Sequence, residues 1–245
     1  GLRFLWTTQT NRAANFPAGT TTSWNNSGYP YADTSLTVLA FENQGYKLTN
    51  DNVAPTGLYE KYIVRRGLNF VLSSLSYVSL TTQTHGVNID SPCVGPGIEA
   101  APCDGYQTGG DQGYTEALAI LSIAGSGTPA RVNTEVNLPA APAGKSLLNK
   151  TYGEILQRML NTLVWGQNDS GSGRGGWYYT FNSTVGDGST VGWDTLAFLD
   201  AQAAGAVLPA FAKSEYAIGL NCGLNTDGSF DYNFDCNAAS DNNVG

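Results

Sequence analysis

The feature that most constrains the fold is an apolar segment that occurs three times and ends each time in glycine. The terminal glycines, Gly45, Gly125 and Gly205, are evenly spaced along the chain. Helix-forming residues fill each segment, and the glycine stands where a helix C-cap places it. Apolar residues cover most of the circumference, which is typical of a helix buried on all sides. We therefore expect three buried helices, at residues 33–45, 113–125 and 193–205.

Helices of a second kind are predicted between these segments. Residues 152–165 place apolar side chains at helical spacing, which gives one apolar stripe and a polar back. Similar patterns predict helices at 2–8, 57–78 and 209–220. Amphipathic and buried helices thus alternate, as they do in two-layer helical rings. No stretch alternates apolar and polar residues between hairpin turns, so we expect little sheet.

Long glycine-rich loops connect each amphipathic helix to the next buried helix, and these loops carry aromatic residues. Loops of such length tend to be functional or separately stabilised. We interpret the aromatic side chains as structural, packing on the ends of helices. They are Trp24, Tyr106, Trp177 and Phe230.

Short motifs at the helix ends carry a family resemblance. Residues 1–5 read GLRFL and are followed by Gln9, while residues 165–167 read WGQ and are followed by GGW at 175–177. These motifs resemble the repeats of squalene/hopene cyclases and protein prenyltransferase β subunits. The resemblance implies an all-α fold of the α/α-toroid type, in which the glutamine bonds the following loop and the tryptophan packs on the helix end.

A third copy of the motif, RGLNF at residues 66–70, has Leu75 near the position of the glutamine. Closed toroids use about five to seven helical hairpins, because each repeat contacts only its neighbours until the ring closes. The predicted helices of this chain provide about three and a half hairpins. We therefore expect residues 1–245 to form a single toroid-like domain, open or partial, that is a fragment of a longer chain.

The catalytic residues of that family do not carry over to this chain. Acid-initiated cyclases need a DxDD motif, and the nearest candidate, at residues 193–196, has the single carboxylate of Asp194. Prenyltransferases hold zinc with Asp, Cys and His, but the one histidine here is His85, which we place on the surface. We therefore predict no catalytic residues and no zinc site.

Acidic residues mark the starts of the three predicted buried helices. Asp33, Asp111 and Asp194 stand there, so parallel inner helices would bring them to one rim. One interpretation is helix capping; the other is an acidic rim that binds a cation, a sugar or a basic peptide. Glu42 and Glu116 lie within buried helices. Pairs of carboxylates across a helical ring can hydrolyse glycosides, so catalysis stays an alternative.

Four cysteines form two local pairs, Cys93 with Cys103 and Cys222 with Cys236. Zinc sites need closer spacing or additional histidine, so disulfides and an oxidising compartment are the better interpretation. The oxygen-rich stretch that follows Cys222 is a candidate calcium site, although it lacks the spacing and the closing glutamate of a calcium loop. Its candidate ligands are Asp227, Asp231 and Asp235.

Charge and composition restrict the partners. The net charge is −8, which disfavours binding to nucleic acid and to anionic membranes. Charged residues make up only 13% of the chain, and 30 residues are glycine. No apolar run is long enough to span a membrane, and the composition is typical of secreted or surface proteins.

The predicted function is a non-catalytic binding or structural module of an extracellular protein, with other chains or flanking domains as partners. The alternative is a carbohydrate-active hydrolase or lyase, or a terpenoid cyclase relative, acting in the central cavity. An enzyme should have an open inner pocket with convergent carboxylates, whereas a structural module should have a filled cavity.

Overall fold

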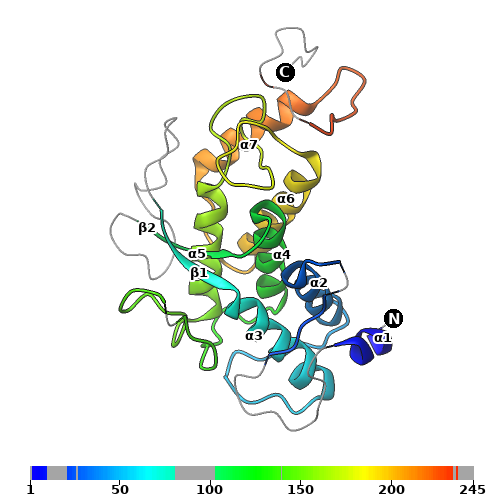
Figure 1. The fold of residues 1–245 in the computed structure, drawn as a ribbon, viewed down its shortest axis with the longest axis vertical. Coiled ribbons are helices and arrows are strands. Elements are labelled where there is room, and N and C mark those ends of the chain that lie inside the picture. The colour runs from blue at the N-terminus through cyan, green and yellow to red at the C-terminus, as the bar shows by residue number, and fades with distance from the viewer. Residues whose placement is uncertain are drawn as a thin grey trace.

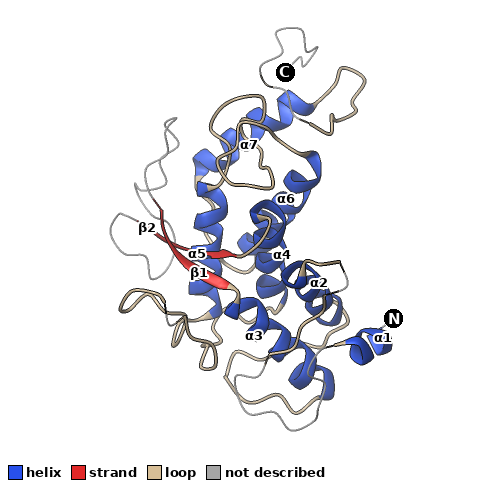
Figure 2. Ribbon diagram, in the orientation of Figure 1, coloured by secondary structure: helices blue, strands red, loops and turns tan. Residues whose placement is uncertain are grey.

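The computed structural model describes residues 2–9, 21–25, 27–80, 103–138, 140–233 and 236. This part of the chain is mostly helical, with one small antiparallel sheet (Figures 1 and 2). The helices are α1 (Leu2–Thr8), α2 (Pro30–Glu42), α3 (Arg65–Ser73), α4 (Gln112–Gly125), α5 (Tyr152–Trp165), α6 (Gly188–Ala203) and α7 (Ala210–Gly223), with a π-helical turn, Glu60–Val64, before α3. The strands are β1 (Leu75–Leu80) and β2 (Cys103–Thr108).

Helix α4 is the centre of the fold. It contacts α2 on one side and α6 on the other, and α5 and β2 also pack on it (Figure 1). Residues 115–124 of α4 are all buried, as the sequence predicts. The same expectation is wrong for α2 and α6, which expose Leu36, Leu196 and Leu199. These two helices stand at the ends of the row α2–α4–α6, where fewer elements cover their apolar residues than cover those of α4.

Two of the three repeated glycines end their helices as expected. Gly45 and Gly205 follow α2 and α6 with φ of 89° and 96°, a conformation that favours glycine. Gly125 differs, because it is the last residue of α4 itself. Helix α6 also begins at Gly188, five residues before the predicted start, a difference that decides where Asp194 lies.

The predicted helix at 57–78 is wrong in its last part. Helical structure ends at Ser73, and residues from Leu75 onward form β1, which pairs with β2 in the register Tyr77↔Tyr106. The strand reads LSYVSL, and its buried ends, Leu75 and Leu80, anchor it to the core. Aromatic and β-branched residues of this kind favour a pleated surface over a helix.

Helix α5 has the predicted bounds and begins with a capping box between Thr151 and Glu154. Its polar back is buried, contrary to the expected exposed face, because β2 and a later loop cover it. The Gln157 side chain bonds both backbone groups of Val207: its amide donates to the carbonyl at 3.0 Å and its carbonyl accepts from the N–H at 2.7 Å.

The glutamine and tryptophan of the repeat motif join helix ends to loops in two places. The indole N–H of Trp177 donates to the carbonyl of Leu163 at 2.8 Å, and the Gln167 amide donates to the carbonyl of Gly175 at 2.9 Å. We call this arrangement a Gln–Trp latch. The indole bond satisfies the Leu163 carbonyl in the last turn of α5, where carbonyls lack a partner within the helix, and the amide bond holds the loop at Gly175.

A second latch closes on α1. The indole N–H of Trp24 donates to the carbonyl of Leu5 at 2.9 Å, and Gln9 accepts from the hydroxyl of Thr22 at 3.1 Å. The third copy of the motif has no latch, because Leu75 occupies the glutamine position and starts β1 instead. Strand pairing therefore joins this helix end to its loop.

The four loop aromatics do not all lie in the core. Trp24, Tyr106 and Trp177 are 1%, 1% and 0% exposed, and the Tyr106 hydroxyl donates to the carbonyl of Lys145 at 3.1 Å. Phe230 is 57% exposed, so it does not pack on a helix end as predicted. The backbone of Phe230 forms an isolated β-bridge with Leu224, while its ring is exposed to solvent.

Candidate binding cleft

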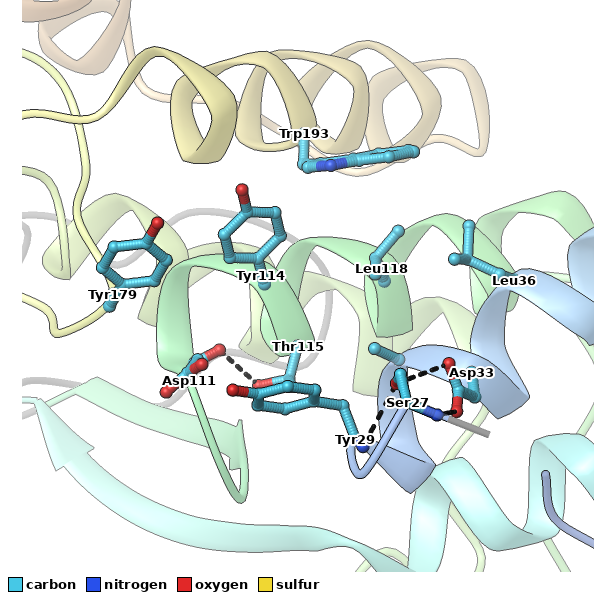
Figure 3. A pocket seen from close by; sticks show the side chains of 11 residues that line it. Ser27, Tyr29, Asp33, Leu36, Asp111, Tyr114, Thr115, Leu118, Tyr179 and Trp193 are labelled. Atoms are coloured by element: carbon cyan, nitrogen blue, oxygen red, sulfur yellow. Dashed lines mark hydrogen bonds between the residues drawn. The ribbon is translucent and has the colours of Figure 1, made fainter. Parts of the chain in front are cut away.

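A cleft of about 320 Å³ opens at the N-terminal ends of α2 and α4 and beside the first half of α6 (Figure 3). Its volume is at the lower end of the range for small-molecule sites. Aromatic and apolar side chains make most of its lining, with two carboxylates among them. The lining residues are Ser27, Tyr29, Ala32, Asp33, Leu36, Asp111, Tyr114, Thr115, Leu118, Tyr179 and Trp193.

Four aromatic rings surround the cleft. Trp193 of α6 and Tyr29, just before α2, lie on opposite sides, with the α4 residues Tyr114 and Leu118 between them (Figure 3). The Tyr114 ring stacks on Tyr179, with centroids 5.6 Å apart and planes 23° from parallel. Tyr29 is 51% exposed and the other three rings are partly exposed, so a ligand can reach their faces.

Two of the three predicted rim carboxylates line this cleft. Asp33 accepts hydrogen bonds from the N–H and the hydroxyl of Ser27, both at 2.9 Å, which shapes the turn before α2. Asp111 is the N-cap residue of α4, yet its side chain makes no capping bond. Its carboxylate is therefore available to a ligand.

The third predicted rim residue, Asp194, does not lie on the rim. Because α6 begins at Gly188, Asp194 falls in its second turn and is 0% exposed. The N-cap of α6 is Asp187, which accepts from the N–H groups of Ser189 and Thr190 at 2.9 and 3.1 Å. The sequence DGST at 187–190 is the capping signal that points to this start.

A hydroxyl network holds the tyrosine end of the cleft. The Tyr114 hydroxyl bonds Ser189, and Ser189 bonds Asp187 and, at 3.1 Å, Tyr232. The negative charge of Asp187 is the main cause that raises the pKa of Tyr179 to about 12. Tyr179 is therefore a neutral hydroxyl at physiological pH. The Tyr114 hydroxyl is held through Ser189, which also bonds Tyr232 near the C-terminal end of the described chain.

Glu116 and Asp194 form a buried acidic pair behind the cleft, at the contact between α4 and α6. One oxygen of Glu116 accepts from the N–H and the hydroxyl of Thr108, at 2.7 and 3.1 Å. Burial raises the pKa of Glu116 to about 8. Burial, and then the charge of Glu116, raise the pKa of Asp194 well above its usual value. Both carboxyls are fully buried, so neither contacts a ligand in the cleft.

The remaining buried acid, Glu42, lies at the C-terminal end of α2. It packs against Gly125 at the far end of α4 from the cleft. Burial raises its pKa well above the usual value. Glu42 therefore does not pair with Glu116 across a cavity, which is the arrangement that catalysis would need.

The candidate calcium ligands have other roles. Asp227 accepts from the N–H and hydroxyl of Ser229, at 2.9 and 2.7 Å, and Asp231 accepts from the Asn225 amide at 2.9 Å. Asp235 lies outside the described residues. No group of three possible metal ligands occurs in the part of the chain that the structure describes.

The disulfide between Cys222 and Cys236 is formed, as predicted. Cys93, the Cys103 side chain and His85 lie outside the described residues, so the other bridge stays a prediction. In the ranges that the structure describes, no helix is long and apolar enough to cross a membrane.

Sequence analysis identified the carboxylates of the cleft but missed its aromatic rings. Tyr29, Tyr114 and Trp193 stand beside the predicted helix starts, and Tyr179 follows the latch residue Trp177. Each of the three predicted buried helices has an aromatic residue near its start, and this pattern could have predicted an aromatic cleft where those starts meet.

Comparison of the chain with protein-family models, curated proteins and solved structures gives no match, so the cleft is interpreted from its own geometry.

Proposed function

We propose that the chain is a non-catalytic binding module of an extracellular protein, and that the cleft between α2, α4 and α6 is its binding surface. The observation that carries this proposal is the set of four partly exposed aromatic rings around one opening. A purely structural module would fill such a space with its own side chains. An open aromatic cleft therefore favours binding.

The arrangement of the carboxyls favours binding over glycoside hydrolysis. That chemistry needs two carboxyls that both contact the substrate, one of them as a proton donor. In the cleft, Asp33 is engaged by Ser27. The carboxyls with strongly raised pKa, Glu116 and Asp194, are buried behind the wall. The cleft thus offers Asp111 and its aromatic rings for binding, whereas the two carboxyls whose pKa burial raises lie outside it.

The extracellular location and the toroid architecture are parts of the same proposal. The Cys222–Cys236 disulfide supports an oxidising compartment. The row α2–α4–α6, with α3 and α5 packed on it, supports an open arc of helical hairpins. Flanking domains or other chains are the proposed partners, because Leu196 and Leu199 leave an apolar face on α6 exposed.

A ligand screen on matched variants tests the proposal. Trp193→Ala removes a partly exposed cleft ring, whereas Phe4→Ala removes a ring that is 61% exposed on α1, away from the cleft. We expect Trp193→Ala to lose the stabilisation by any ligand that raises the wild-type melting temperature, and Phe4→Ala to keep it. Glycan cleavage that disappears in Glu116→Gln would show instead that the chain is an enzyme.

A further inference from the structure

We infer that the cleft binds an organic ammonium ion, with a trimethylammonium group as its best-fitting form. This inference rests on the proposed function, because it names the ligand class of the same cleft. It follows from three properties of the described lining: aromatic faces, acidic side chains without basic ones, and few free hydrogen-bond donors.

The aromatic faces provide the first argument. Ammonium ions bind over the faces of Trp and Tyr because the ring quadrupole is negative there. Trp193 and Tyr29 face the cleft from opposite sides, and Tyr114 lies on α4 between them (Figure 3). Rings from α6, from α4 and from the residue before α2 thus line one cleft, as rings line an aromatic cage.

Charge provides the second argument. Asp33 and Asp111 both line the cleft, and no Lys, Arg or His is among the described residues that line it. The Asp111 side chain makes no capping bond, so its charge is not offset locally. The chain as a whole carries −8, which adds attraction for a cation at long range. An anionic ligand meets repulsion from the same groups.

Hydrogen-bonding capacity separates a cation from a sugar. A saccharide needs several directed donors and acceptors around its ring, whereas a trimethylammonium group needs none. The Thr115 hydroxyl already donates to the Asp111 carbonyl at 2.7 Å, and the Tyr114 hydroxyl bonds Ser189. No Asn or Gln is among the described residues that line the cleft, which leaves the Tyr29 hydroxyl and the Trp193 indole N–H as donors. The lining therefore satisfies a quaternary ammonium group better than a polyol.

The test compares three probes by calorimetry on the purified chain. They are choline, its neutral analogue with carbon in place of the ammonium nitrogen, and phosphocholine. We expect the neutral analogue to bind about tenfold more weakly than choline, because it lacks the cation–π and charge attraction. Phosphocholine should also bind more weakly, since its phosphate is repelled by the two carboxylates. A cleft that selects a lipid headgroup would instead prefer phosphocholine, and that result would overturn the inference.

Charge and ring variants locate the binding. Asp111→Asn keeps a good N-cap residue. It should weaken choline binding about three- to tenfold while leaving the neutral analogue unchanged. Asp200→Asn, which removes an exposed carboxylate of α6 that does not line the cleft, is the matched control and should bind choline like the wild type. The Trp193→Ala variant should bind neither choline nor the neutral analogue.

The outcomes distinguish this inference from the proposed function. Equal binding of choline and the neutral analogue, or choline binding that survives Trp193→Ala, would overturn the inference. A saccharide that binds the wild type but not Trp193→Ala, with no choline binding, would overturn the inference and leave the proposed function standing. If choline, the analogue and a glycan panel all fail to bind the folded protein, both proposals fail.

Discussion

Trp177 and Trp193 occupy opposite kinds of position, although both stand near the N-terminal side of α6. Trp177 is 0% exposed, contacts Phe198 edge-on with centroids 5.1 Å apart, and closes a Gln–Trp latch. Trp193 is partly exposed at the cleft. The two residues therefore separate a structural role from a binding role.

Trp177→Ala should destabilise the protein strongly. Truncating a buried tryptophan costs about 3–5 kcal/mol through lost transfer energy and the cavity left behind. The latch bond to Leu163 is lost as well. Urea denaturation measures the change, and Trp193→Ala is the control that should unfold near the wild-type midpoint. A wild-type midpoint for Trp177→Ala would contradict the structural role.

The buried Glu116 should make stability depend on pH. Its pKa is about 8 in the folded protein against an ordinary value of 4.5, so between these values the folded state retains a proton that the unfolded chain releases. Stability should therefore fall as pH rises from about 4.5 to about 8, and level off above that. The raised pKa of Asp194 acts in the same direction.

Glu116→Gln tests this dependence, because the amide keeps an acceptor oxygen for Thr108 but carries no titrating proton. The variant should lose less stability than the wild type across this pH interval in thermal unfolding. Asp200→Asn, an exposed carboxylate on α6, should follow the wild-type profile. Identical profiles for Glu116→Gln and the wild type would rule out Glu116 as the cause.

At the scale of elements, local signals predicted helices well and strands poorly. Residues 152–165 were predicted as a helix and form α5 with those bounds, since periodicity and a capping box agree there. Strand β1 was predicted as the end of a helix, because its partner β2 lies far along the chain and no local pattern announces the pairing. The site residues were predicted correctly only where the helix start was. Asp111 is the N-cap of α4, close to the predicted start. Asp194 was predicted at the start of a helix, but α6 begins earlier, at Gly188.

Glycines on helices should respond to substitution in opposite directions. A Cβ on Gly67 would lie 2.3 Å from the Val38 Cγ2 atom, so Gly67→Ala should force α3 away from α2 and cost about 1–3 kcal/mol. A Cβ on Gly192 of α6 would meet no atom within 4 Å, so Gly192→Ala should stabilise by up to about 1 kcal/mol. Denaturation midpoints check the pair, and equal shifts would contradict the close contact between α2 and α3.

At the scale of the whole molecule, the C-terminal region is tied to the cleft by covalent and polar bonds. Cys222–Cys236 closes the loop that carries Tyr232, whose hydroxyl bonds Ser189 next to Tyr114. The Cys236 N–H also donates to the carbonyl of Ser172 at 2.9 Å. Stability of this end of the cleft thus depends on a bond made outside it.

Removing this disulfide should destabilise the protein by about 3 kcal/mol, the chain-entropy value for a loop of this size. The double variant Cys222→Ala/Cys236→Ala, compared with the wild type in urea, measures the loss. Thiol labelling of the unfolded, unreduced wild type should find no reactive cysteine. Two reactive thiols would contradict the predicted Cys93–Cys103 bridge alone, and four would contradict both.

The Gln–Trp latches also bear on how the chain reaches its native state. Their indole bonds join residues only 19 and 14 positions apart. Closing so short a loop loses little entropy, and chains rich in such local contacts fold rapidly. One hairpin can therefore close while the following residues are still emerging from the ribosome. Contacts between distant segments, such as Arg65 with Glu135 (70 positions apart) and Arg131 with Thr49 (82 positions apart), should form later.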